Sequence, residues 1–202
     1  MAGHAKEELS KALLKLSNEM PLEKIGVNDV LKESSISRHT FYASFRDIYD
    51  LITYTFINRI IDTSWDMLRT SYDDYYHGML TSLKKMERHK KFCLEAYILH
   101  GQNAPIDYIV QHSIEAESQD LVNLTGKQPE ELPLHILRLY AHGCVNTKMH
   151  WLKDPQGTTA ESVARQITDA RFALFAGIIN DDAIIHHSKS VGSDLFVAVP
   201  FS

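Results

Sequence analysis

Glycine and proline are widely spaced along the first half of this sequence. No proline falls between Pro21 and Pro105, and no glycine falls between Gly26 and Gly78. Because these residues interrupt helices and mark turns, their absence over such long stretches favours helices. Asn-Gly and Asp-Gly dipeptides, which mark tight hairpins, do not occur in the chain. The sequence therefore predicts an all-α protein.

Apolar side chains recur at helical spacing in most segments between these breaks. This periodicity predicts about nine helices, at residues 5–18, 27–33, 37–45, 47–72, 75–86, 90–99, 103–124, 133–153 and 159–180. The pattern is lost from residue 181 onward. The LFVAVPF run near the C-terminus is compatible with a strand, a docked tail or disorder.

Composition narrows the class of protein. The chain has 202 residues, of which 44% are hydrophobic, enough for a core of its own. Its two cysteines, Cys93 and Cys144, fit buried thiols in a reducing compartment. No apolar run reaches the roughly 18 residues of a membrane span, and the N-terminal segment lacks the apolar stretch of a secretory signal. We therefore expect a cytoplasmic protein that does not bind membranes.

Residues 25–51 carry the most specific pattern. Two short predicted helices, 27–33 and 37–45, are joined by Ser34, Ser35 and Ile36, which is the layout of a helix-turn-helix. Ile36 would fill the space between the helices, and the Ser37 hydroxyl would cap the second one. The free amides at that helix start, with the positive end of the helix dipole, would suit a phosphate.

The second of these helices carries side chains suited to DNA. Arg38 can pair with guanine or clamp a phosphate. His39 can donate to a base edge or a phosphate, while Thr40 and Tyr42 offer hydroxyls to the backbone. A helix of this kind fits the major groove, which is about 12 Å wide.

The string from Ile36 to Phe45, with Leu51 at the matching distance and the Lys24 to Val30 segment before it, resembles the tetracycline-repressor (TetR) family of bacterial transcriptional regulators. The resemblance is strong over residues 5–52 and architectural beyond them. It implies a DNA-binding domain at 1–46 and an effector-binding and dimerisation domain at 47–202, with the tail 183–202 unassigned. The DNA-binding residues expected from this pattern are Gly26, Val27, Ser37, Arg38, His39, Thr40, Tyr42 and Arg46.

Three positions depart from the family pattern. Gly26 replaces a frequent Thr, Ser35 replaces the usual turn glycine and would carry modest strain in a left-handed turn, and Ile48 replaces a lysine that would contact phosphate. Residues 1–51 hold seven Lys and Arg against eight Asp and Glu, a net charge of −1 within a chain of net −5. Few phosphate contacts are therefore expected, which favours binding as a dimer to a pseudo-palindromic operator. These features also leave open a co-regulator or protein-interaction module with this fold but without autonomous DNA binding.

The last two predicted helices supply an expected dimer face, because the resemblance implies a four-helix interface there. The residues assigned to it are Leu137, Tyr140, Ala141, Cys144, Val145, Trp151, Ile167, Ala170, Leu174 and Ile178. The alternative is that these side chains form the core of a single chain.

The middle helices are expected to enclose a small-molecule effector, whose binding would release the protein from its operator as in a repressor. Candidate lining residues are Tyr54, Trp65, Tyr76, Phe92, Tyr97 and His100. The alternative for each is an ordinary core position. The eleven histidines show no metal-binding spacing, so neither a metal nor a cofactor is expected. Cys93 and His100 form only a nominal nucleophile–base pair, and no enzymatic activity is expected.

Overall fold

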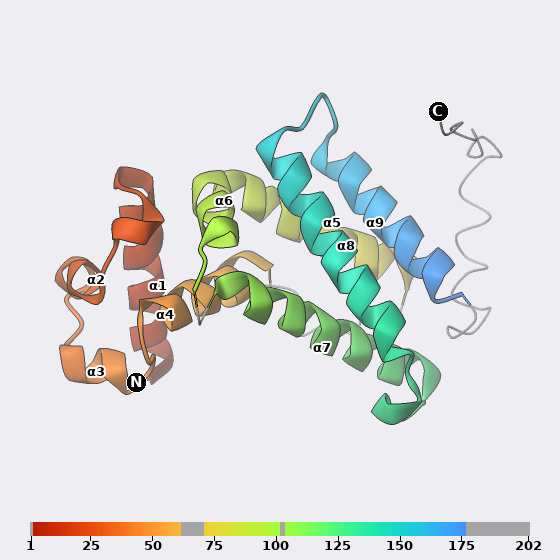
Figure 1. The fold of residues 1–202 in the computed structure, drawn as a ribbon, viewed down its shortest axis with the longest axis horizontal. Helices are drawn as coiled ribbons and strands as arrows, with labels where there is room; N and C mark the ends of the chain where they lie inside the picture. The colour runs from red at the N-terminus through yellow and green to blue at the C-terminus, as the bar shows by residue number, and fades with distance from the viewer. Residues whose placement is uncertain (1, 62–70, 102–103, 177–202) are drawn as a thin grey trace.

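The N-terminal helices form a small group of their own at one end of the molecule (Figure 1). The computed structural model describes residues 2–61, 71–101 and 104–176. In this group are α1 (Ala2–Glu19), α2 (Val27–Ser34) and α3 (Arg38–Tyr42), with the short 3₁₀ turn η1 (Leu22–Lys24) after α1. α1 packs against both α2 and α3, so the longest helix of the group is the support for the two short ones.

The periodicity of these helices explains their packing. Leu9, Leu13 and Leu16 of α1 are buried at helical spacing, and they share one apolar core with Val30 of α2 and Phe41 of α3. The chain between α1 and α2 is anchored by Leu22 and Ile25, which are also buried.

The fourth helix differs from the expectation of a single helix over 47–72. Asp47 caps α4 (Ile48–Thr55), since its side chain accepts a hydrogen bond from the Asp50 amide at 2.9 Å. The chain then continues as the π-helical turn η2 (Phe56–Ile61). The next helix starts at Tyr72 because the Ser71 hydroxyl accepts a hydrogen bond from the Asp74 amide at 3.1 Å. The Ser71 cap thus sets the start of α5, which the sequence had placed at residue 75, and residues 62–70 of the expected helix over 47–72 lie outside the described residues.

The C-terminal region consists of longer helices. They are α5 (Tyr72–Arg88), α6 (Lys90–Ile98), α7 (Pro105–Thr125), α8 (Leu134–Lys153) and α9 (Ala160–Leu174), with the 3₁₀ turn η3 (Pro129–Glu131) before α8. α8 and α9 form an antiparallel hairpin, and α5 packs along α9 (Figure 1). The described residues hold nine α-helices and no strand, so the all-α prediction is confirmed. The LFVAVPF run lies outside the described residues.

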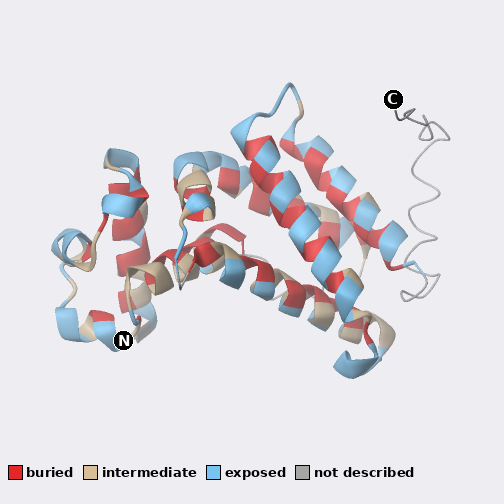
Figure 2. Cartoon of the chain, in the orientation of Figure 1, coloured by how far each residue is buried: buried red, intermediate tan, exposed pale blue. Residues whose placement is uncertain are grey.

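One continuous apolar core joins the two regions (Figure 2). α4 contributes Leu51, Ile52 and Phe56 to it and packs against both α1 and α7. On α8 and α9 the buried and exposed residues alternate as two faces of each helix (Figure 2). Among the described helices, none is long and apolar enough to cross a membrane.

Candidate nucleic-acid interface and sensing region

The segment from α2 to α3 has the turn and the cap that its sequence predicts. Ser35 adopts a left-handed backbone with a φ of 57°, which confirms the strain expected where a glycine is usual. Ser37 then caps α3, because its hydroxyl accepts a hydrogen bond from the Thr40 amide at 3.1 Å. Ile36 is half-buried and packs against the core between the two helices.

The apolar side chains of the second helix hold it in place and leave its polar side chains outside. Phe41 and Phe45 are buried, with ring centroids 5.8 Å apart. Ser37, Arg38 and His39 are exposed, Tyr42 is 51% exposed, and Thr40 is half-buried. The inward and outward faces are therefore those that the sequence predicts.

The expected DNA-binding residues fall into two adjoining groups. Val27, Tyr42 and Arg46 line a surface hollow of about 380 Å³ together with Tyr49. Ser37, Arg38 and His39 lie at the start of α3. Gly26 is the cap of α2, and its amide donates to the Asp29 carboxylate at 2.9 Å.

Both arginines on this surface are held by neighbouring side chains. Arg38 donates a hydrogen bond to the amide oxygen of Asn28 in α2. The Arg46 guanidinium lies 3.5 Å from the Asp50 carboxylate. Asn28 and Tyr49 were not expected in this surface. The sequence signal that could have indicated Asn28 is its position on α2, ten residues before Arg38 and on the other side of the turn.

Polar contacts tie α6 to the N-terminal helices. The Glu95 carboxylate accepts a hydrogen bond from the Leu22 amide at 2.7 Å. The Lys91 ammonium donates to the main-chain oxygen of Met20 at 3.2 Å and lies 3.5 Å from that of Asn18. The C-terminal region is thus joined to the start of the helix-turn-helix through one short helix as well as through α4.

Six residues are expected to line an effector pocket, and the five that the structure describes do not meet in one place. Tyr54 packs edge-on against Phe45 in the N-terminal core, Phe92 is buried against Phe56, and Tyr76 lies beside Arg165. His100 is exposed after α6, and Trp65 lies outside the described residues. Of the five described candidates, only Tyr97 lines a sizeable cavity, so most of these aromatic residues are core positions.

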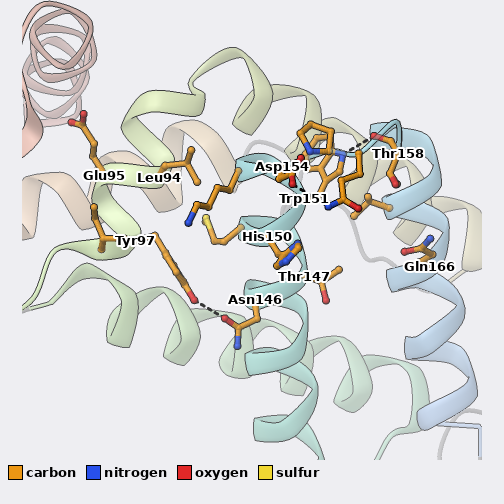
Figure 3. A pocket seen from close by; sticks show the side chains of 16 residues that line it. Leu94, Glu95, Tyr97, Asn146, Thr147, His150, Trp151, Asp154, Thr158 and Gln166 are labelled. Atoms are coloured by element: carbon orange, nitrogen blue, oxygen red, sulfur yellow. Dashed lines mark hydrogen bonds between the residues drawn. The ribbon is translucent and has the colours of Figure 1, made fainter. Parts of the chain in front are cut away.

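That cavity is an open groove of about 850 Å³ between α6 and the α8–α9 hairpin (Figure 3). Tyr97 reaches from α6 to α8, where its hydroxyl donates to the Asn146 side chain at 2.5 Å. Trp151 is buried at the groove floor, and its indole N–H donates to the Thr158 carbonyl at 2.9 Å. Glu95 lies at the end of the groove nearest the N-terminal helices (Figure 3).

The interior of the C-terminal region contains charged and phenolic groups. The Arg171 guanidinium is fully buried, 2.5 Å from the Glu117 carboxylate and 3.8 Å from that of Asp120. The Tyr75 and Tyr140 hydroxyls lie 2.9 Å apart. Burial raises the pKa of the Tyr140 phenol well above its ordinary value, so this hydroxyl remains a donor at neutral pH. The cavity beside them holds only about 30 Å³, room for about one water.

Most of the side chains assigned to the dimer face are buried within one chain. These are Leu137, Tyr140, Ala141, Cys144, Val145, Trp151 and Ile167. They lie on the inward faces of α8 and α9, so this part of the expected residue set is corrected to core. Ala170 is exposed and Leu174 is 42% exposed, whereas Ile178 lies outside the described residues. The dimer itself stays a prediction.

Metal-binding side chains do not gather in the described parts of the chain, where no cluster of three or more His, Cys, Asp or Glu residues is placed to hold an ion. Burial raises the pKa of the Cys93 thiol, and His100 is exposed while Cys93 is buried. The nominal Cys93–His100 pair therefore has a protonated, inaccessible sulfur.

Comparisons with known proteins give the same class of protein as the fold. Residues 73–171 match the family model described as "Transcriptional regulator C-terminal region". No curated protein matches the chain in sequence. Two solved structures share its fold, each with a TM-score of 0.57 at 16% identity. The first is "Dihydroxyacetone kinase operon activator DhaS", and the match covers 87% of this chain and 98% of that one. The second is a putative TetR-family transcriptional regulator from Syntrophomonas wolfei, and the match covers 89% of this chain and 98% of that one.

A helix-turn-helix on an all-helical body with this C-terminal region defines a class of transcriptional regulators. The chain belongs to the TetR family of that class, as the Ile36–Phe45 string predicted. Proteins of this family are generally not enzymes.

Proposed function

We propose that the protein is a homodimeric DNA-binding transcriptional regulator whose α3 enters the major groove of a pseudo-palindromic operator. The observation that carries this proposal is the outward row of Ser37, Arg38, His39 and Tyr42 on a helix fixed by Phe41. Arginine and histidine can read base edges there, and the hydroxyls can contact phosphates.

Few cationic groups on this surface imply that one chain alone binds weakly. A dimer would add a second half-site one helical turn away. The exposed faces of α8 and α9 support such a dimer: Leu139 is 70% exposed and Leu174 is 42% exposed. Gly143 and Ala170, also exposed, allow two helices to approach closely.

We also propose that a small-molecule effector releases the protein from DNA, as in a repressor. An effector acts by binding one conformation better than the other. The contacts of α6 with Leu22 and Met20, and those of α4 with α1 and α7, offer routes by which such a preference would reach α3.

A gel-shift titration with the DNA upstream of the protein's own gene tests the DNA-binding proposal. We expect a shift at low salt that weakens as salt rises. Arg38→Ala should weaken it by about tenfold, in line with roughly 1–3 kcal/mol for a base contact, and Tyr42→Phe by less. Lys127→Ala, which removes one exposed positive charge from the loop before α8, is the matched control and should bind like the wild type.

A second candidate is a co-regulator without autonomous DNA binding. Both arginines of the surface are already engaged, Arg38 by Asn28 and Arg46 by Asp50, and the N-terminal 51 residues carry no positive excess. One structural neighbour is described as an operon activator. A folded dimer that gives no shift at low salt would exclude the first candidate and favour this one.

A further inference from the structure

The groove between α6 and the α8–α9 hairpin has an apolar floor. Leu94, Met149, Trp151 and Val163 line it, and the last three are buried. Its volume of about 850 Å³ lies within the range of small-molecule sites. Ile98, which lines the same groove, is 63% exposed, so an apolar occupant would cover surface that is now in water.

The charged side chains of the groove differ in whether they have partners. Two carboxylates line it, and both already accept hydrogen bonds: Glu95 from the Leu22 amide at 2.7 Å and Asp154 from the Gln156 side chain at 3.0 Å. The Lys153 ammonium and the His150 imidazole, which also line it, have no ion-pair or hydrogen-bond partner among the described residues. Among the charged side chains of the groove, Lys153 is therefore the one without a partner in the described part of the chain.

We propose that this groove binds an apolar monocarboxylate, with its carboxylate at Lys153 and its apolar body along the floor formed by Leu94, Met149 and Trp151. A ligand carboxylate would give Lys153 the ion-pair partner that it lacks among the described residues, whereas Glu95 and Asp154 already accept hydrogen bonds from the chain itself. An uncharged apolar molecule would cover the same floor without the ion pair.

The position of the groove gives such a ligand a way to act on DNA binding. Its walls belong to α6 on one side and to α8 and α9 on the other, and Tyr97 bridges them through Asn146 (Figure 3). Glu95 lines the groove and also holds the Leu22 amide before α2. A ligand that separates α6 from α8 would thus move a residue bonded to the N-terminal helices. This regulatory part rests on the proposed function, whereas the binding part does not.

A second copy of the chain is the alternative occupant. The exposed apolar side chains expected at the dimer face, Leu139 and Leu174, lie where α8 begins and α9 ends. The groove residues Trp151 and Val163 lie where α8 ends and α9 begins, at the other end of the antiparallel hairpin. Leu139 and Leu174 do not line the groove, which favours a ligand as its occupant. Because Asn146 and His150 of the groove continue the α8 face of Leu139 at helical spacing, a second copy is an outcome of the test below.

Fluorescence of Trp151 tests the binding part. The chain has two tryptophans, so Trp65→Phe leaves Trp151, at the groove floor, as the only indole. Decanoate should change its emission saturably, while decanol and decylammonium should need at least about tenfold higher concentrations. The Tm of the wild-type chain, measured with the same three probes, should rise most with decanoate and serves as the second measurement.

The charge variant is Lys153→Gln, with Lys127→Gln as the matched control from an exposed lysine outside the groove. Lys153→Gln should weaken decanoate binding about tenfold and leave decanol binding unchanged, and Lys127→Gln should alter neither. Equal binding of all three probes, or no effect of Lys153→Gln, would overturn the carboxylate assignment. Emission that follows protein concentration and ignores decanoate would assign the groove to a second copy.

The regulatory part is tested by adding decanoate to the gel-shift titration. Decanoate should weaken the shift of the wild type, and Lys91→Met, which removes the α6 contact with Met20 outside the groove, should retain decanoate binding by fluorescence but lose part of that effect. If the protein shifts DNA and decanoate binds without changing the shift, the regulatory part is wrong. If no DNA shifts at all, the proposed function fails while the fluorescence result for the groove still stands.

Discussion

The two regions of the molecule are stabilised by different kinds of interior. Around α1, α2 and α3 the core is made of leucine, isoleucine, valine and phenylalanine, with small hydroxyls such as Ser10 and Thr55 bonded to each other at 3.1 Å. Between α5, α7, α8 and α9 the interior also holds Arg171, Glu117 and Asp120. An apolar core tolerates many hydrophobic substitutions of similar volume, whereas buried charges depend on particular partners.

This difference separates the tasks of the two regions. The N-terminal core has to present a rigid α3, for which well-packed apolar side chains suffice. In the C-terminal region Glu117 lies on α7, Arg171 on α9 and Tyr75 on α5, so the relative positions of three helices are coupled through polar contacts.

The largest effect is expected from breaking the charged interior. Arg171→Ala should lower the free energy of unfolding by about 3–5 kcal/mol, because Glu117 and Asp120 would be left buried without their cation. Urea denaturation followed by circular dichroism measures it. In the double variant Glu117→Leu/Arg171→Met the loss should be smaller, since the Glu117 charge is removed together with its cation and only Asp120, 3.8 Å from Arg171 in the wild type, loses a cationic neighbour. If Arg171→Ala is as stable as the wild type, the buried charges do not stabilise the C-terminal region in the way described above.

A smaller effect is expected in the N-terminal region from loss of a cap. Ser37→Ala removes the acceptor for the Thr40 amide and should cost about 1 kcal/mol. Because α3 has only five residues, the loss should appear as faster amide hydrogen exchange in α3. Ser162→Ala, an exposed serine on α9, is the control and should leave this exchange unchanged.

The smallest effect is expected at the junction of α5 and α6, from His89. Burial, with help from Arg88 and Arg59, lowers the pKa of this imidazole. The unfolded chain therefore binds the proton at a higher pH than the folded one, so His89 should reduce stability as pH falls below about 6.5. His89→Gln should flatten this part of the stability–pH curve measured by urea denaturation. If the slope of this curve is the same in His89→Gln, the pH dependence of stability comes from other titratable groups.

The sequence predicted the N-terminal region better than the C-terminal one, for local reasons. All the features of the helix-turn-helix lie within a dozen residues: the turn at Ser34–Ile36, the Ser37 cap and the buried Phe41 and Phe45. One short segment of sequence is therefore enough to predict them. The helices of the C-terminal region were also predicted, because their apolar periodicity is strong. Which face of α8 and α9 points inward depends on contacts with α5 and α7 that no single segment reveals.

The site residues were missed for the same reason. Tyr97 was selected with five other residues by aromatic character alone, yet only it meets Asn146, which lies 49 positions further along the chain. Arg171, Glu117 and Asp120 carry no local signal either, since charged residues on a helix ordinarily face solvent. Their pairing becomes visible only when α7 and α9 are placed together.

The contacts between α6 and the N-terminal helices have a consequence for how such a protein changes over evolutionary time. Lys91 donates to the main-chain oxygens of residues 18 and 20, and Glu95 accepts from the amide of residue 22. Every amino acid offers the oxygens, and every one except proline offers the amide. The side chains at positions 18 and 20 can therefore be replaced without loss of these bonds, whereas Leu22 is also constrained by its burial in the core. Mutations confined to two positions on α6 can loosen or tighten this contact, so the coupling between the two regions can diverge between relatives while α3 is unchanged.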